Sequence, residues 1–213
     1  MIPFHVPIHS LDWNPEMTAF PNLLGVGGQE VSSPAYRLRG ATRRGNPHIL
    51  FQLTLDGCGI FKQGRRSYDV RPGLGFLCQS HNPDVTYFYP KGAKDPWTFV
   101  YMCFSGSSAV AMADDLVRRH GPIFALDTSD PFVSRMMEYA DIAPDGSMVT
   151  PVADGAYLVA GLMHRLLSNV QSHPSGDSAP VSAPEANVKL ADPPASNYKG
   201  DPLASHRCET VQV

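Results

Sequence analysis

The sequence predicts a protein that is mainly β, a small barrel or jelly roll, followed by about three α-helices. Two observations predict this fold class. Between His48 and Gly106, short apolar and β-branched runs are separated at close intervals by glycine and proline turn signals, a pattern typical of strands joined by tight turns. After Gly106 the apolar period lengthens from two residues to about three and a half, which indicates helices.

The barrel region divides into six expected strands. Asp56-Gly57, Gly64 and Pro72-Gly73 mark the corners between the first four, because glycine adopts the backbone angles that tight turns require. The runs between the corners have strand length and are rich in aromatic and β-branched residues, which suit a half-buried sheet. The expected strands are Ile49–Leu55, Gly59–Gln63, Arg66–Val70, Leu74–Cys78, Val85–Tyr89 and Trp97–Phe104.

Three helices are expected after the barrel, each with recognisable ends. Serines open the first, Asp130 and Pro131 open the second, and Thr150 and Pro151 open the third, as is common at helix N-termini. The expected helices are Ser107–His120, Phe132–Ile142 and Val152–Val170.

The order of four local motifs carries a family resemblance. They are Asp-Gly-x-Gly at Asp56–Gly59, Gly-Arg-Arg-x-Tyr at Gly64–Tyr68, Arg-Pro-Gly at Arg71–Gly73, and Pro-Trp-x-Phe-x-x-x-x-Phe-x-Gly at Pro96–Gly106. Together they resemble the N-terminal sensor domain of bacterial AraC-type transcription regulators over roughly residues 20 to 170. The resemblance implies a cupin-like double-stranded β-helix, that is, a jelly-roll barrel, which binds a small effector, often a sugar, and pairs through the helices that follow.

The resemblance divides the chain into four parts. These are an N-terminal arm at 1–19, a ligand-binding barrel at 20–106, a helical dimerisation region at 107–170, and a linker with a disordered tail at 171–213. Phe4 and Trp13 give the arm the apolar residues to close over a ligand, although a disordered leader is the alternative. The tail is rich in Ser, Pro, Ala and Asp, a composition that buries too little apolar surface to order the chain.

In the family, two helix-turn-helix units follow the sensor domain, and the tail shows no recognition helix. We therefore expect DNA contact only through a domain that this chain lacks. A truncated or frameshifted gene, an engineered fragment, and a natural sensor-only protein that acts through mixed dimers all remain open.

The third expected helix has an apolar row at coiled-coil spacing. Its members, three, four and three residues apart, are Val159, Leu162, Leu166 and Asn169. Periodicity alone favours packing on the helix's own core, whereas the resemblance implies that this row pairs two copies into a homodimer. Asn169 would then either fix the register or mark the fraying helix end.

The expected ligand residues also follow from the resemblance. Trp97 stands where the family has its pocket tryptophan and would form a platform beneath a sugar ring, with core packing as the alternative reading. Tyr87 and Tyr89 lie on one face of the preceding strand. Arg43 or Arg44 would present a guanidinium to hydroxyl groups or a carboxylate.

Composition limits the remaining function classes. The formal net charge of −3 gives no overall basic field for nucleic acid, and no run is long and apolar enough for a membrane span. The N-terminus, MIPFHVPIHSLDW, has neither a charged n-region nor a continuous apolar run, so we expect a cytoplasmic protein. The four cysteines form no C-x-x-C pair and are interpreted as reduced thiols.

A cupin enzyme is the main alternative to a sensor. The barrel region contains only the isolated His48 and His81, without the His-x-His and glutamate that metal-binding cupins present. We therefore expect no metal, no cofactor and no catalytic residues.

Overall fold

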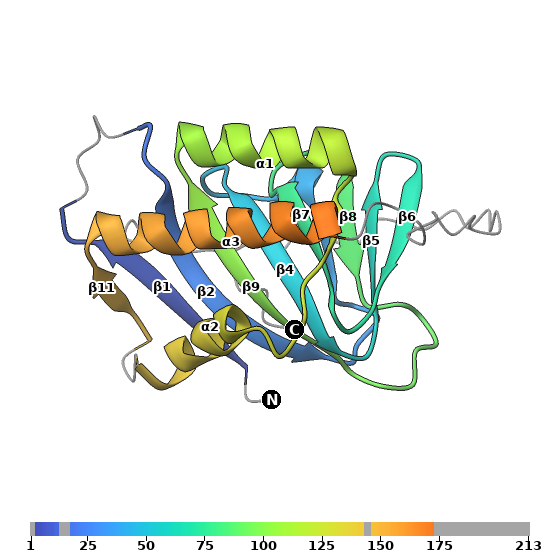
Figure 1. The fold of residues 1–213 in the computed structure, drawn as a ribbon. Helices are drawn as coiled ribbons and strands as arrows, with labels where there is room; N and C mark the ends of the chain where they lie inside the picture. The colour runs from blue at the N-terminus through green and yellow to red at the C-terminus, as the bar shows by residue number, and fades with distance from the viewer. Residues whose placement is uncertain (1–2, 13–17, 143–145, 173–213) are drawn as a thin grey trace.

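The structure is a computed structural model that describes residues 3–12, 18–142 and 146–172. It confirms the predicted fold class, a mainly β jelly-roll-like fold with three helices (Figure 1). A seven-stranded sheet and a four-stranded sheet face each other, and the helices cover the other side of the larger sheet. The molecule therefore has three layers.

The seven-stranded sheet has the order β10-β7-β4-β9-β2-β1-β11. All its neighbouring pairs are antiparallel except β1 and β11, which run parallel. Its strands are β1 (Phe4–Ser10), β2 (Asn22–Val31), β4 (Ile49–Asp56), β7 (Leu74–Gln79), β9 (Trp97–Ser105), β10 (Ile123–Ala125) and β11 (Met148–Thr150).

The four-stranded sheet has the order β3-β8-β5-β6 and is antiparallel throughout. A short 3-10 helix, η1 (Gly40–Thr42), follows β3. The strands are β3 (Arg37–Arg39), β5 (Gly59–Gln63), β6 (Arg66–Val70) and β8 (Val85–Phe88).

The central strands of the larger sheet are apolar on both faces because each face is covered. On β4, Phe51 and Leu53 face the helices, whereas Leu50 faces the interior between the sheets. The same alternation on β9 puts Val100 and Met102 on the helix side. This two-sided burial explains why the sequence shows nearly continuous apolar runs there.

The helices are α1 (Ser107–His120), α2 (Pro131–Ile142) and α3 (Val152–Ser172). They lie across one face of the seven-stranded sheet (Figure 1). None of the described helices has both the length and the apolar character needed to cross a membrane.

Strand pairing connects the expected arm and the expected helical region to the main sheet. Phe4–Ser10, expected in a separate arm, forms β1 and pairs with β2 inside the main sheet. The helical region also returns to that sheet twice, as β10 beside β7 and β11 beside β1. The barrel and the helices therefore share one core. Trp13 and residues 173–213, the greater part of the expected tail, lie outside the described residues.

The predicted dimerisation row on α3 belongs to this core. Val159, Leu162 and Leu166 are each 0% exposed and pack with the sheet. The Asn169 amide donates a hydrogen bond to the Ala125 carbonyl, 2.9 Å away, and so ties the end of α3 to β10. The three apolar side chains cover the sheet and are therefore not on the outer surface of α3.

Candidate ligand site between the two sheets

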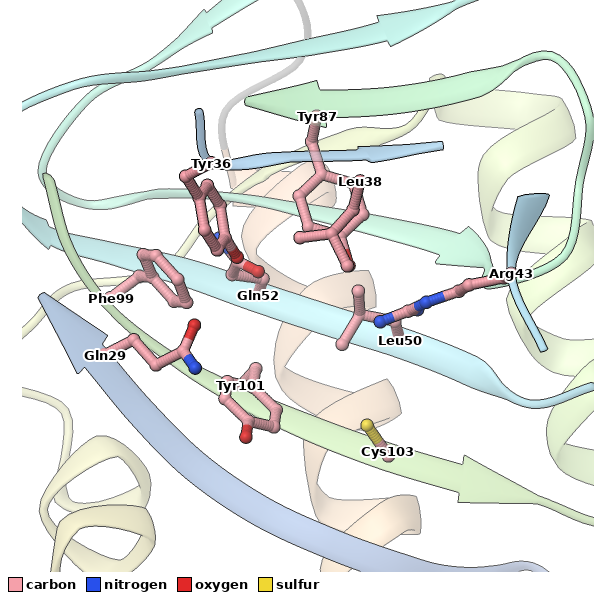
Figure 2. Close-up of a pocket in the computed structure, with 10 residues that line it drawn as sticks. All are labelled: Gln29, Tyr36, Leu38, Arg43, Leu50, Gln52, Tyr87, Phe99, Tyr101 and Cys103. Carbon is pink, nitrogen blue, oxygen red and sulfur yellow. The ribbon is translucent and has the colours of Figure 1, made fainter. Parts of the chain in front are cut away.

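A small cavity lies in the interior of the jelly roll, between the two sheets. Figure 2 shows side chains from both sheets pointing toward it. The seven-stranded sheet contributes Gln29, Leu50, Gln52, Phe99, Tyr101 and Cys103. The side of the four-stranded sheet contributes Tyr36, Leu38, Arg43 and Tyr87.

Strand register brings the polar members of this lining together. Gln52 of β4 lies opposite Tyr101 of β9, and Gln29 of β2 lies opposite Phe99 of the same strand. Since side chains alternate across a strand, Tyr101 and Phe99 share the interior face. Both amides therefore reach the cavity from strands that flank β9.

The cavity is nearly filled by its own side chains. Its volume is about 20 Å³, enough for roughly one water molecule. A monosaccharide needs several times this space, so the two sheets or their side chains must separate before a ligand of that size enters.

Gln52 is the most informative residue of the lining. Its side chain is 2% exposed, and among the described residues its Nε2 has no hydrogen-bond partner. Leaving a buried donor unsatisfied costs about 1–3 kcal/mol. An acceptor bound in the cavity would remove this penalty.

Arg43 and Tyr36 add charge and a phenol to the same interior. The Arg43 guanidinium lies 5.9 Å from the centre of the Tyr87 ring. Burial raises the pKa of Tyr36 well above its usual value, the nearby Tyr87 and Tyr101 phenols raise it further, and Arg43 opposes them. Tyr36 therefore stays a neutral hydrogen-bonding group at physiological pH.

The N-terminal strand contacts the cavity wall through one side chain. His5 of β1 stacks on Tyr101, and its Nδ1 lies 2.9 Å from the Tyr101 hydroxyl. Tyr101 lines the cavity, so His5 connects β1 to the cavity wall.

Trp97 does not line the cavity. Its side chain is 0% exposed, and its indole Nε1 donates to the Thr54 hydroxyl at 3.0 Å. The ring packs edge-on against Tyr36 and covers Gly59. Trp97, predicted as the ligand platform, therefore packs in the core beside this cavity and does not form part of its lining.

The other predicted ligand residues divide into two pairs. Tyr87 and Arg43 line the cavity, whereas Tyr89 and Arg44 do not. The Tyr89 hydroxyl donates to the carbonyls of the following loop, and Arg44 is exposed. The structure thus distinguishes the two arginines, which the sequence did not.

Sequence reasoning missed both amides and two of the tyrosines in the lining. Two had a detectable signal, since Gln29 and Gln52 are amides inside otherwise apolar strands. Tyr36 and Tyr101 gave none, because their position depends on pairing between distant strands. These four residues are Gln29, Gln52, Tyr36 and Tyr101.

In the part of the chain that the structure describes, no group of three or more His, Cys, Asp or Glu side chains is placed to hold a metal ion. His48 and His81 do lie together, with ring centres 6.1 Å apart. The His81 Nδ1 is 2.8 Å from the Ser80 hydroxyl. These contacts join two loops at the end of the barrel.

No family model matches the chain, and no curated protein matches it significantly. Solved structures with some similarity include the protein YhaK from Escherichia coli, at 16% identity and TM-score 0.41, covering 60% of this chain and 52% of that chain. The AraC-like transcriptional activator CuxR has 13% identity and TM-score 0.40, with coverage of 80% and 54%. ToxT from Vibrio cholerae O395, solved with (E)-4-(8-methylnaphthalen-1-yl)but-3-enoic acid, has 7% identity and TM-score 0.37, with coverage of 72% and 60%.

This chain therefore spans a little more than half of the length of these three proteins. A function for this chain has to be argued from its own residues.

Proposed function

We propose that this chain is the ligand-sensing domain of an AraC-type transcription regulator and binds a small polar effector between its two sheets. The motif order from Asp56 to Gly106 supports the family. The buried Gln52 amide, whose Nε2 has no partner among the described residues, supports the site. The effector acts in the cytoplasm and controls transcription through an attached or partner DNA-binding domain.

The lining defines the chemistry of the effector. Gln52 offers a donor, Arg43 a cationic fork and Tyr36 a neutral hydroxyl, while aromatic and aliphatic side chains supply the apolar walls. Such a lining suits a compact molecule with several hydroxyl groups or one carboxylate, such as a sugar or a sugar acid. Binding has to open the interior, and the free energy of that opening lowers the affinity.

A thermal-shift screen with sugars, sugar acids and aromatic acids tests this proposal. A ligand at about 100 times its dissociation constant stabilises the fold by about 2.7 kcal/mol. The variant Gln52→Leu should lose this response because it removes the buried donor. Gln63→Leu makes the same chemical change at the end of β5 and should keep the response. A response that survives in Gln52→Leu would place the ligand elsewhere.

We also propose that the chain forms a homodimer, and that the two copies pair through the outward face of α3 and not through its inward apolar row. The outward residues of this helix repeat at the three-four-three spacing that pairs helices. They are Tyr157, Ala160, His164 and Leu167. Tyr157 is 78% and Leu167 41% exposed, which leaves apolar surface for a second copy.

Light scattering after size exclusion tests the pairing. The double variant Tyr157→Ser/Leu167→Ser should halve the measured mass, because it removes apolar surface from the proposed interface. Met112→Ser changes an exposed methionine on α1 and should leave the mass unchanged. A monomeric unmodified chain would overturn the dimer without affecting the ligand site.

A further inference from the structure

The outer face of the four-stranded sheet carries a group of cations. Arg37 and Arg39 lie two residues apart on β3 and so point to the same side. Lys62 joins them, because Arg39 and Lys62 both lie opposite Thr86 on β8. The residues that alternate with these are buried between the sheets: Leu38, Phe61 and Tyr87. We call Arg37, Arg39 and Lys62 the cationic face.

In the part of the chain that the structure describes, carboxylates do not neutralise these cations. Among the described residues, none of the three forms an ion pair. The Arg37 guanidinium lies 3.8 Å from the centre of the Phe88 ring, and the Lys62 ammonium lies 5.7 Å from it. Partial burial and the neighbouring Arg39 lower the pKa of Arg37. Like charges held this close favour an anion beside them.

The net charge of −3 conceals an uneven distribution. Residues 32–97, which supply the four-stranded sheet and its loops and also β4 and β7, contain ten Lys and Arg, of which Arg43 lines the cavity, against four Asp. The described residues of 107–172, which carry the three helices, contain four Lys and Arg against seven Asp and Glu. The two layers lie on opposite sides of the seven-stranded sheet. Since packed layers are usually about 10 Å apart, the two outer layers are separated by roughly 20 Å. Since the screening length is about 10 Å at 0.1 M salt, the acidic helices do not cancel the cationic face.

We propose that the cationic face binds the phosphate backbone of a nucleic acid without reading its bases. Residues two apart on a strand are separated by about 6.6 Å, so the sheet presents charges in a regular array. Arginine also pairs with phosphate oxygens in a bidentate manner. This surface lies outside the interior cavity, and the inference does not depend on an effector.

The loops at both ends of the sheet extend this array. Arg65 and Arg66 lie at the β5–β6 turn, and Lys91 and Lys94 lie in the segment between β8 and β9. An extended array suits a polymer with one charge per repeat better than a single acidic side chain. This extension favours nucleic acid over an acidic patch on a protein.

Fluorescence anisotropy of the full chain with a labelled 20-base-pair duplex of arbitrary sequence tests the inference. We expect a dissociation constant of about 1–100 µM at about 0.1 M salt, the range of non-specific binding. The variant Arg37→Gln/Arg39→Gln/Lys62→Gln should bind about tenfold or more weakly. Its slope of log affinity against log salt should fall by about 0.9 for each lost phosphate contact.

The helical layer provides a matched control. Arg118→Gln/Arg119→Gln/Arg135→Gln removes the same number of charges from side chains that are 61–69% exposed. This control should bind the duplex within twofold of the unmodified chain. If both triple variants lose affinity equally, the effect is one of net charge and the proposal is overturned.

Two further outcomes would also overturn it. One is no measurable binding of the duplex at low salt. The other is tighter binding of polyglutamate than of DNA, which would assign the face to an acidic protein. If the triple variant does not fold, Arg39→Gln/Lys62→Gln leaves the Arg37–Phe88 contact in place and should still weaken binding several-fold.

Discussion

The indole Nε1 of Trp97 donates a hydrogen bond of 3.0 Å to the hydroxyl of Thr54. That hydroxyl in turn donates to the carbonyl of Val70, 3.2 Å away. Trp97 and Thr54 belong to the seven-stranded sheet and Val70 to the four-stranded sheet. The three groups therefore connect the sheets through a buried polar chain.

We predict that Trp97→Phe destabilises the protein without specifically removing ligand binding. The change deletes a buried donor and part of a fully buried ring, which should lower the free energy of unfolding by about 1–3 kcal/mol. Urea denaturation measures this loss. A variant that keeps its stability but no longer responds to an effector would return Trp97 to the ligand site.

The space beside this indole gives a second prediction. A Cβ added at Gly59 would lie 2.2 Å from the Trp97 ring, so Gly59→Ala should destabilise the protein by about 1–3 kcal/mol through overpacking. Gly161→Ala is the control, since its Cβ would meet nothing closer than 3.6 Å on α3. There alanine should stabilise the helix by about 0.5–1 kcal/mol. Equal effects of the two changes, measured by thermal melting, would contradict the packing described.

The inward row of α3 gives a third prediction, which concerns stability alone. Leu162→Ala should lower the free energy of unfolding by about 2–5 kcal/mol, because the side chain is 0% exposed against the sheet and a cavity remains. The oligomeric mass of the protein that stays folded should not change. A folded variant with normal stability and altered mass would restore this row to the dimer interface.

The Cys78 thiol gives a prediction about pH. Burial raises its pKa from 9.0 to about 12, although Arg43 opposes the shift. Because the folded pKa is raised, this thiol contributes stability that is fully present below about pH 9 and is lost as pH rises toward 12. Cys78→Ala should therefore weaken the loss of stability in that alkaline range, as followed by denaturation at several pH values.

Labelling provides a second measurement for the same thiol. At pH 8 a thiol with a pKa of about 12 is ionised in only about one molecule in 10⁴, and the thiolate is the reactive form. Iodoacetamide should therefore modify Cys78 in the native protein far more slowly than after denaturation. Equal rates in the two states would show that Cys78 is not buried as described.

The sequence by itself determined the mainly β fold class, the six strands between Ile49 and Phe104 and the three helices after them, but not the short or flanking strands β1, β2, β3, β10 and β11. Turn signals such as Asp56-Gly57 are local, and the predicted strand Gly59–Gln63 has the same limits in the structure. Local propensity and short-range turn chemistry suffice for such features.

Only the tertiary structure decided which face of each element is buried and which side chains meet. Val159 and Tyr157 have equally reasonable places in a helical repeat, but only the sheet beneath α3 makes one of them core and leaves the other exposed. Gln52, Arg43 and Tyr36 likewise come from separate segments and converge on one cavity. Such convergence depends on long-range strand register, which no local pattern specifies.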